Sequence, residues 1–131
     1  MDELLAVVPM QQEFIVQGRV NPAALEAVNA KVDQASVGKP VALRFTVEEV
    51  AAHRKDGYAF KVRGQPQPLS LRGQAIIGRV EMLCRQDESD ALSRIRKSSI
   101  IVMRGVVSRA ELEGSGRTVN FTVTVADAKL Q

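Results

Sequence analysis

The chain has 131 residues, which is the length of one domain. About 45% of the residues are hydrophobic and the formal net charge is only +3, a composition that excludes an intrinsically disordered chain. Cys84 is the only cysteine and His53 the only histidine, so a disulfide scaffold is excluded and a tetrahedral metal centre lacks ligands.

We expect no secretory signal in the N-terminal residues of this sequence. It begins with the acidic Met1-Asp2-Glu3, and the apolar run of residues 4–8 is shorter than the roughly 7–15 residues of a secretory signal's apolar region. No stretch approaches the ~20 apolar residues of a membrane helix. We therefore expect a cytoplasmic protein without a membrane span, although a signal segment removed beforehand would leave no trace in this sequence.

Charge divides the chain into two parts. Residues 1–38 hold two basic and five acidic residues, a formal charge of −3, whereas residues 39–131 hold sixteen basic and ten acidic residues, a charge of +6. Basic surfaces attract polyanions over long range. We predict an N-terminal extension over residues 1–38 and a basic domain over residues 39–131.

The extension contains an amphipathic helix, expected over about residues 22–36. Asn21 is a favourable N-cap, and Pro22 is tolerated at the first helical position. Apolar residues then follow at spacings of three and four and form one stripe: Leu25, Val28, Val32 and Ala35.

From Lys39 onward, apolar residues alternate with polar ones, as in half-buried strands. Asp56-Gly57 favours a hairpin turn because both residues tolerate positive φ, and the Gly64–Pro68 segment is expected to be a loop. A helix of about three turns, capped by Asp87, is expected over residues 87–98. The predicted strands cover about residues 41–47, 58–63, 74–85, 99–112 and 117–130.

This order of elements predicts the fold. Three strands, a short helix and a closing hairpin are typical of the oligonucleotide/oligosaccharide-binding fold (OB-fold), a five-stranded Greek-key barrel. We predict a mainly β chain with an OB-like barrel, a helix between strands 3 and 4, and the amphipathic helix before strand 1. Gly105 would relieve a tight bend in the fourth strand. A two-layer α+β domain with an open sheet is the alternative architecture.

Two segments carry a resemblance to a known family. The segment NAKVDQASVGKPV, with Gly38-Lys39, and the segment DALSRIRKSSIIVMRGVVS, with Gly105, resemble the bacterial tRNA-anticodon-like OB-fold family of small, mostly uncharacterised proteins. The similarity covers roughly residues 29–125. Val37 stands where that family often has a tyrosine. The resemblance implies the OB-fold, and it links the chain to nucleic acid by fold analogy only.

No combination of side chains indicates catalysis. Residues 73–78 have the glycine spacing of a phosphate-binding loop but lack the Lys and Ser/Thr that must follow. A nucleophile pair would require His53 and Cys84 to meet, yet the alternation places Cys84 on a core face. The acidic residues near Asp87 suit a helix N-terminus. We expect no enzyme, no cofactor and no metal.

Basic residues are the remaining candidates for a binding site. In OB-folds the ligand usually crosses strands 2 and 3, between the loops that join strands 1–2 and 4–5. Cationic side chains there suit phosphate contacts, and Tyr58 is the one ring expected to be exposed for base stacking. The alternative is an ordinary charged sheet surface. The predicted nucleic-acid-binding residues are Arg54, Lys55, Tyr58, Lys61, Arg63, Arg72, Arg79 and Arg117.

Two functions remain open. The first is a non-enzymatic OB-fold module that binds single-stranded DNA or RNA through this basic face with little base selectivity. The second is a protein-interaction or structural assembly domain whose partner is another protein or a second copy of the chain. The shortage of aromatic residues and the acidic N-terminal segment favour the second.

Overall fold

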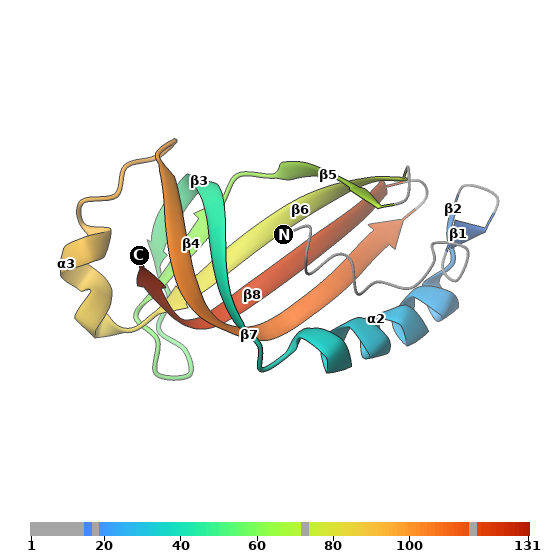
Figure 1. Ribbon diagram of the computed structural model, residues 1–131, viewed down its shortest axis with the longest axis horizontal. Coiled ribbons are helices and arrows are strands. Elements are labelled where there is room, and N and C mark those ends of the chain that lie inside the picture. Colours follow the sequence, from blue (N-terminus) through green and yellow to red (C-terminus); the bar gives the residue numbers. More distant parts are fainter. Residues whose placement is uncertain (1–14, 17–18, 72–73, 116–117) are drawn as a thin grey trace.

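A computed structural model describes residues 15–16, 19–71, 74–115 and 118–131 (Figure 1). A short antiparallel pair, β1 (Ile15–Val16) and β2 (Arg19–Val20), precedes the helix α2 (Pro22–Ser36). A 3₁₀ turn, η2 (Gln86–Glu88), and the helix α3 (Ser89–Leu92) lie between the sixth and seventh strands. The other strands form one mixed sheet: β3 (Pro40–Ala52), β4 (Phe60–Gly64), β5 (Gln67–Leu71), β6 (Gln74–Cys84), β7 (Ile100–Ser115) and β8 (Thr118–Leu130).

The helix α2 has the bounds that the sequence predicts. The Asn21 side chain accepts a hydrogen bond from the Ala24 amide at 3.1 Å, and Pro22 occupies the first turn. The predicted apolar stripe is buried at Leu25, Val28 and Val32. Neither described helix is long and apolar enough to cross a membrane.

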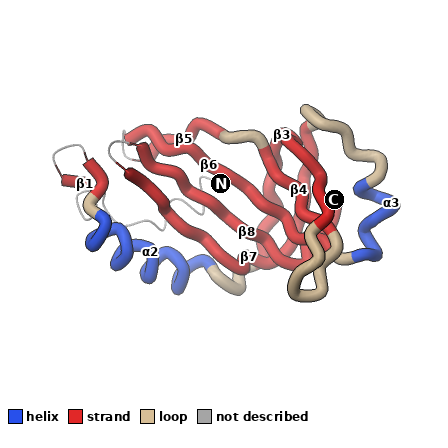
Figure 2. The backbone as a smooth tube through the Cα atoms, turned by 180° about the vertical axis from the view of Figure 1, so that it is seen from behind, coloured by secondary structure: helices blue, strands red, loops and turns tan. Residues whose placement is uncertain are grey.

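The six strands pair in the order β4-β3-β7-β8-β6-β5, and β4 also pairs with β6. Pairing therefore passes from β3 through β4, β6, β8 and β7 back to β3, which makes a partial ring through five strands. Every pair is antiparallel except β6–β8, which is parallel. At the other end of the molecule, β5, β6, β8 and β7 continue as an open sheet (Figure 2).

The predicted inward faces form the core. Alternate residues of β3, β6 and β8 are buried, among them Phe45, Met82 and Phe121. Cys84 lies on the same inner face and is fully buried, as its position in the alternation predicts. Local periodicity was therefore a reliable guide to which side chains face inward.

The Gly64–Pro68 segment differs from the expected loop, because β5 begins at Gln67. β4 pairs with the C-terminal half of β6, and β5 takes over the pairing with the N-terminal half, from Gln67 opposite Gly78. Pro68 cannot donate a ladder hydrogen bond, and β5 is the last strand of the sheet order, where proline is tolerated.

The predicted three-turn helix is shorter than expected, since α3 ends at Leu92. Asp87 does not cap it: no side-chain hydrogen bond caps either η2 or α3. The chain turns after Leu92 and joins β3, where the Ser98 amide donates to the Val47 carbonyl at 2.8 Å. Tertiary contact with β3 therefore replaces the last two helical turns.

Gly105 lies at a close approach between β7 and β8. A Cβ at this position would come within 2.5 Å of the Ala126 carbonyl oxygen, so only glycine fits without a backbone shift. The register shifts here, since Val106 pairs with Ala126 and Arg104 with Lys129, which leaves an extra residue in β8. Asp127 lies in this β-bulge with a positive φ of 50°.

The helix α2 runs along β7 where β3 no longer pairs with it (Figure 2). The Asn29 side chain donates to the Leu112 carbonyl and accepts from the Leu112 amide, both at 2.7 Å. The side-chain amide thus takes the place of a neighbouring strand at this point of the sheet edge. Such cover protects an edge from pairing with another chain.

Candidate nucleic-acid interface

Lys61 and Arg63 lie together on the outer face of β4, but acidic residues surround them. Arg63 is directly opposite Glu49 of β3 and Glu81 of β6. Its guanidinium bonds to Glu49 at 3.0 Å and lies 4.0 Å from Glu81, while the Lys61 ammonium lies 3.5 Å from Glu81. The hydrogen bond that Arg63 donates to the Glu49 carboxylate raises the pKa of Arg63. This four-residue group has no net charge, so its attraction for phosphate is weak.

Arg54 and Lys55 lie in the exposed loop that joins β3 to β4. Asp56 and Gly57 have positive φ values of 56° and 83°, as the predicted turn requires. Neither Arg54 nor Lys55 has an ion pair within the part of the chain that the structure describes. They remain available for binding, at the loop tip and away from the neutral group on β4.

Tyr58 is half-buried, and a cation covers its ring. The Arg85 guanidinium lies 4.8 Å from the ring centroid, within the range of a cation–π contact. The same guanidinium bonds to Asp127 at 2.6 Å, which raises the pKa of Arg85. A base can therefore stack on this face of Tyr58 only if Arg85 moves away.

Arg79 is exposed on the outer face of β6, opposite Thr122 of β8. It has no ion pair among the described residues. Arg72 and Arg117, the two other predicted contacts, lie outside the described residues. The structure thus brings Lys61 and Arg63 together, neutralises both, and leaves Arg79 on the adjacent strand β6 without an ion pair among the described residues.

A different basic surface occupies the outer face of β3, β7 and β8. We call Arg44, Arg104 and Lys129 the β7 basic group. Arg104 lies directly opposite Lys129 on one side and Ala42 on the other, and Arg44 is diagonal to Arg104. All three are exposed, and none has an ion pair among the described residues. Like charges in directly opposed positions destabilise a sheet, and an anion bound between Arg104 and Lys129 would relieve that repulsion.

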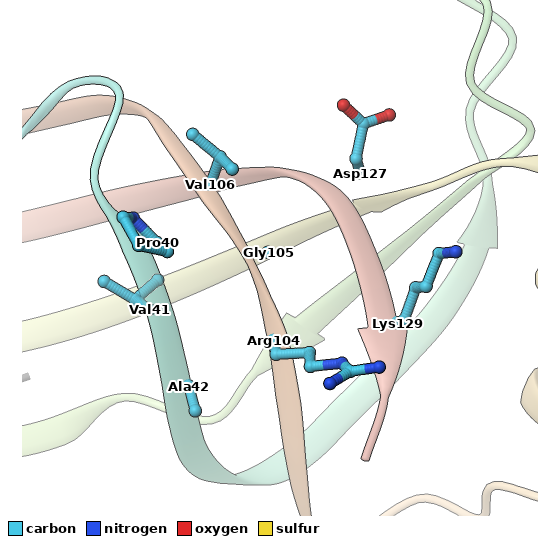
Figure 3. Close-up of a pocket in the computed structure, with 8 residues that line it drawn as sticks. All are labelled: Pro40, Val41, Ala42, Arg104, Gly105, Val106, Asp127 and Lys129. Atoms are coloured by element: carbon cyan, nitrogen blue, oxygen red, sulfur yellow. The ribbon is translucent and has the colours of Figure 1, made fainter.

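Arg104 and Lys129 border an open hollow of about 370 Å³ (Figure 3). Its floor is apolar, and Val106 on its edge is 39% exposed. The neighbouring hollow, about 340 Å³, contains Arg44 and Ile100, which is 62% exposed. Exposed apolar side chains of β7 therefore lie near the cations of β3, β7 and β8 on this outer face. The described lining of the first hollow is Pro40, Val41, Ala42, Arg104, Gly105, Val106, Asp127 and Lys129.

The predicted binding residues do not include the β7 basic group, although the sequence pattern already indicates the outward position of two of its members. The alternation of strands 41–47 and 99–112 already places Arg44 and Arg104 outward, at equivalent positions of two similar segments. Two facts were not visible: that these strands pair with each other, and that the bulge at Asp127 sets Lys129 opposite Arg104.

A second group of cations follows α3. Arg94, Arg96 and Lys97 were expected at the end of a helix, but α3 ends before them and they are exposed in the turn that leads to β7. None has an ion pair among the described residues. This turn adds positive charge at the start of β7.

The Cys84 thiol is not suited to act as a nucleophile. Burial raises the pKa of Cys84 to about 12, so the reactive thiolate is almost absent at neutral pH. His53 lies at the end of β3, half-exposed, and its amide bonds to the Ala59 carbonyl.

A comparison of the chain with models of known protein families, with curated proteins and with solved structures found no match.

Proposed function

We propose that this chain is a non-enzymatic OB-type module that binds single-stranded nucleic acid through phosphate contacts with the β7 basic group. The observation that carries the proposal is the set of three neighbouring cations that have no ion pair among the described residues. The face on β4 and β6, where the sequence places the ligand, is a weaker candidate because Glu49 and Glu81 neutralise it.

The strand pairing supports an OB-type barrel. The five strands of the partial ring pair in the order 1-2-3-5-4-1, with an antiparallel ladder everywhere except between the third and fifth. A short helix stands between the third and fourth of these strands. We interpret the open sheet at the other end as an extension of that barrel, to which β5 adds a sixth strand.

The surface favours backbone contacts over base recognition. Arginine and lysine bind phosphate oxygens without reading sequence. Exposed aromatic rings, which stack bases in single-strand binders, are missing from the described part of the β7 surface. Ile100 and Val106 offer apolar contact to unstacked bases. Binding is therefore expected to be salt-sensitive and nearly independent of sequence.

The test is fluorescence anisotropy of a labelled mixed-sequence single strand, titrated with the full chain at about 50 to 200 mM salt. Three phosphate contacts predict a slope of log affinity against log salt of about −2, at roughly −0.7 per contact. Over this range, affinity should fall roughly 15-fold. A duplex of the same sequence is titrated in parallel, and single strands should bind more tightly.

Two double variants distinguish the surfaces. Arg104→Gln/Lys129→Gln should reduce affinity at low salt at least tenfold and bring the slope to about −0.7. Lys61→Gln/Arg63→Gln removes the same formal charge from the neutral group and should have a much smaller effect. The reverse ranking would place the ligand on β4 and β6, and wild-type binding that is absent at low salt would refute the function.

One observation favours a protein partner as the second candidate. Ile100 and Val106 are exposed aliphatic residues near Arg44 and Arg104, and protein interfaces combine an apolar core with an enrichment in arginine. Sedimentation velocity over a wide concentration range tests the simplest case, self-association. An Ile100→Ser variant should weaken any self-association, whereas a strictly monomeric wild-type chain would refute assembly with itself.

A further inference from the structure

Asp127 is the one carboxylate among the described residues around the hollow that Arg104 and Lys129 border. In a regular strand, Asp127 and Lys129 would lie two residues apart on the same face. Their charges would then partly cancel, and the site would lose its attraction for phosphate. In Figure 3 the Asp127 carboxylate instead points away from Arg104 and Lys129.

The backbone accounts for the direction of Asp127. Its φ of 50° and the extra residue in β8 are the marks of a β-bulge, which re-aims a side chain. Aspartate adopts this left-handed conformation more readily than most residues. Gly105 on the opposite strand leaves room for the bulge, since a Cβ there would meet the Ala126 carbonyl.

Arg85 holds the Asp127 carboxylate in this orientation. The Arg85 Nε donates to the Asp127 Oδ1 at 2.6 Å. Two further contacts fix the guanidinium: the ring of Tyr58 at 4.8 Å and the Gly57 carbonyl at 3.5 Å. Arg85 therefore connects the loop before β4, the end of β6 and the bulge of β8.

We propose that Arg85 is a positioning residue for the anion site: it binds the Asp127 carboxylate and so keeps Arg104 and Lys129 free for phosphate. This inference rests on the proposed function. Arg85 need not touch the ligand to act in this way. Without it, the Asp127 carboxylate is free to pair with Lys129 or Arg104 and to compete with a phosphate group for them.

A double-mutant cycle tests the inference, with affinity for the labelled single strand as the readout. Arg85→Ala should weaken binding about two- to fivefold beyond the effect of one lost charge. This range corresponds to the usual free energy of an exposed ion pair, because such a pair between Asp127 and Lys129 or Arg104 would compete with the ligand. Arg94→Ala, which removes one exposed positive charge from the turn after α3, calibrates that effect. Arg85→Lys keeps the charge beside Asp127 and should restore most of the affinity.

The decisive comparison uses Asp127→Asn. In this background residue 127 carries no carboxylate for Arg85 to hold, so adding Arg85→Ala should cost no more than Arg94→Ala does. An equal loss from Arg85→Ala in both backgrounds would mean that Arg85 contacts the ligand directly, and the inference would be wrong. That result leaves the proposed function standing, because the function fails if the wild-type chain does not bind at low salt, and the β7 site fails if Arg104→Gln/Lys129→Gln binds like wild type. Thermal unfolding of each variant verifies that it is folded.

Discussion

Cys84 is the clearest case of a single side chain whose chemistry is set by its place in the core. It lies on the inner face of β6, fully buried, and burial raises its pKa from the ordinary value of 9.0 to about 12. The folded state therefore keeps the thiol proton at pH values where the unfolded chain releases it. The contribution of this thiol to stability is therefore constant below about pH 9 and falls between pH 9 and 12.

This difference predicts a specific alkaline response. Between pH 9 and 11 the free energy of unfolding should fall by up to about 1.4 kcal/mol per pH unit through this thiol alone. Urea titrations at several pH values measure the slope, and a Cys84→Ala variant supplies the contribution of all other groups. Equal slopes in the two proteins would show that the buried thiol does not titrate as argued.

The charged residues on β4 show how a neighbour changes a side chain's role. Lys61 and Arg63 lie on the outer face, as the alternation predicts, yet Glu49 and Glu81 lie directly opposite Arg63 on the two adjacent strands. Exposed pairs of this kind contribute little to stability, typically up to about 1 kcal/mol. Their main consequence is electrostatic, because they cancel the positive charge of this face.

Among the elements, α2 has a second structural role that its amphipathic pattern does not predict. Besides burying its apolar stripe, it supplies Asn29 to both backbone groups of Leu112. The helix thus covers the edge of β7 in the part of the strand that does not pair with β3. An unpaired strand edge is prone to pairing between chains.

Removal of this contact should be measurable. Asn29→Ala is expected to lower the free energy of unfolding by about 1–3 kcal/mol, because it leaves the Leu112 amide and carbonyl without partners. Chemical denaturation gives the change, and hydrogen exchange should show faster exchange at the Leu112 amide. Asn120→Ala is the matched control, since the Asn120 Oδ1 has no partner among the described residues. An equal effect of both substitutions would contradict the proposed role of Asn29.

For the whole molecule, the packing of α2 predicts that residues 39–131 do not form an independent unit of full stability. Leu25, Val28 and Val32 are buried, and full burial of each aliphatic side chain is worth roughly 1.5–3 kcal/mol. A chain that begins at Lys39 should therefore lose at least about 4 kcal/mol of stability or fail to fold. Urea denaturation followed by circular dichroism compares it with the full chain. An unchanged midpoint would show that the N-terminal segment is a dispensable extension.

The sequence by itself determined the local features of this protein. It located α2 to the residue, the turn at Asp56-Gly57 and the inward faces of the strands, including the burial of Cys84. These features depend on neighbours within a few positions: a cap, a periodicity, a residue that tolerates positive φ. The mainly β class followed from them as well.

Only the tertiary structure decided which strands meet and at what register. Pairing partners lie far apart in the chain, and alternation is the same whichever strand lies alongside. The sequence therefore did not predict that Glu49 and Glu81 lie opposite Arg63. It also did not predict that β5 begins within the expected loop, at Gln67, where it pairs with β6. The helix after β6 is shorter than predicted because the chain turns to contact β3. The β7 basic group depends on the same non-local register, together with one bulge at Asp127 that turns a carboxylate away and sets Lys129 opposite Arg104.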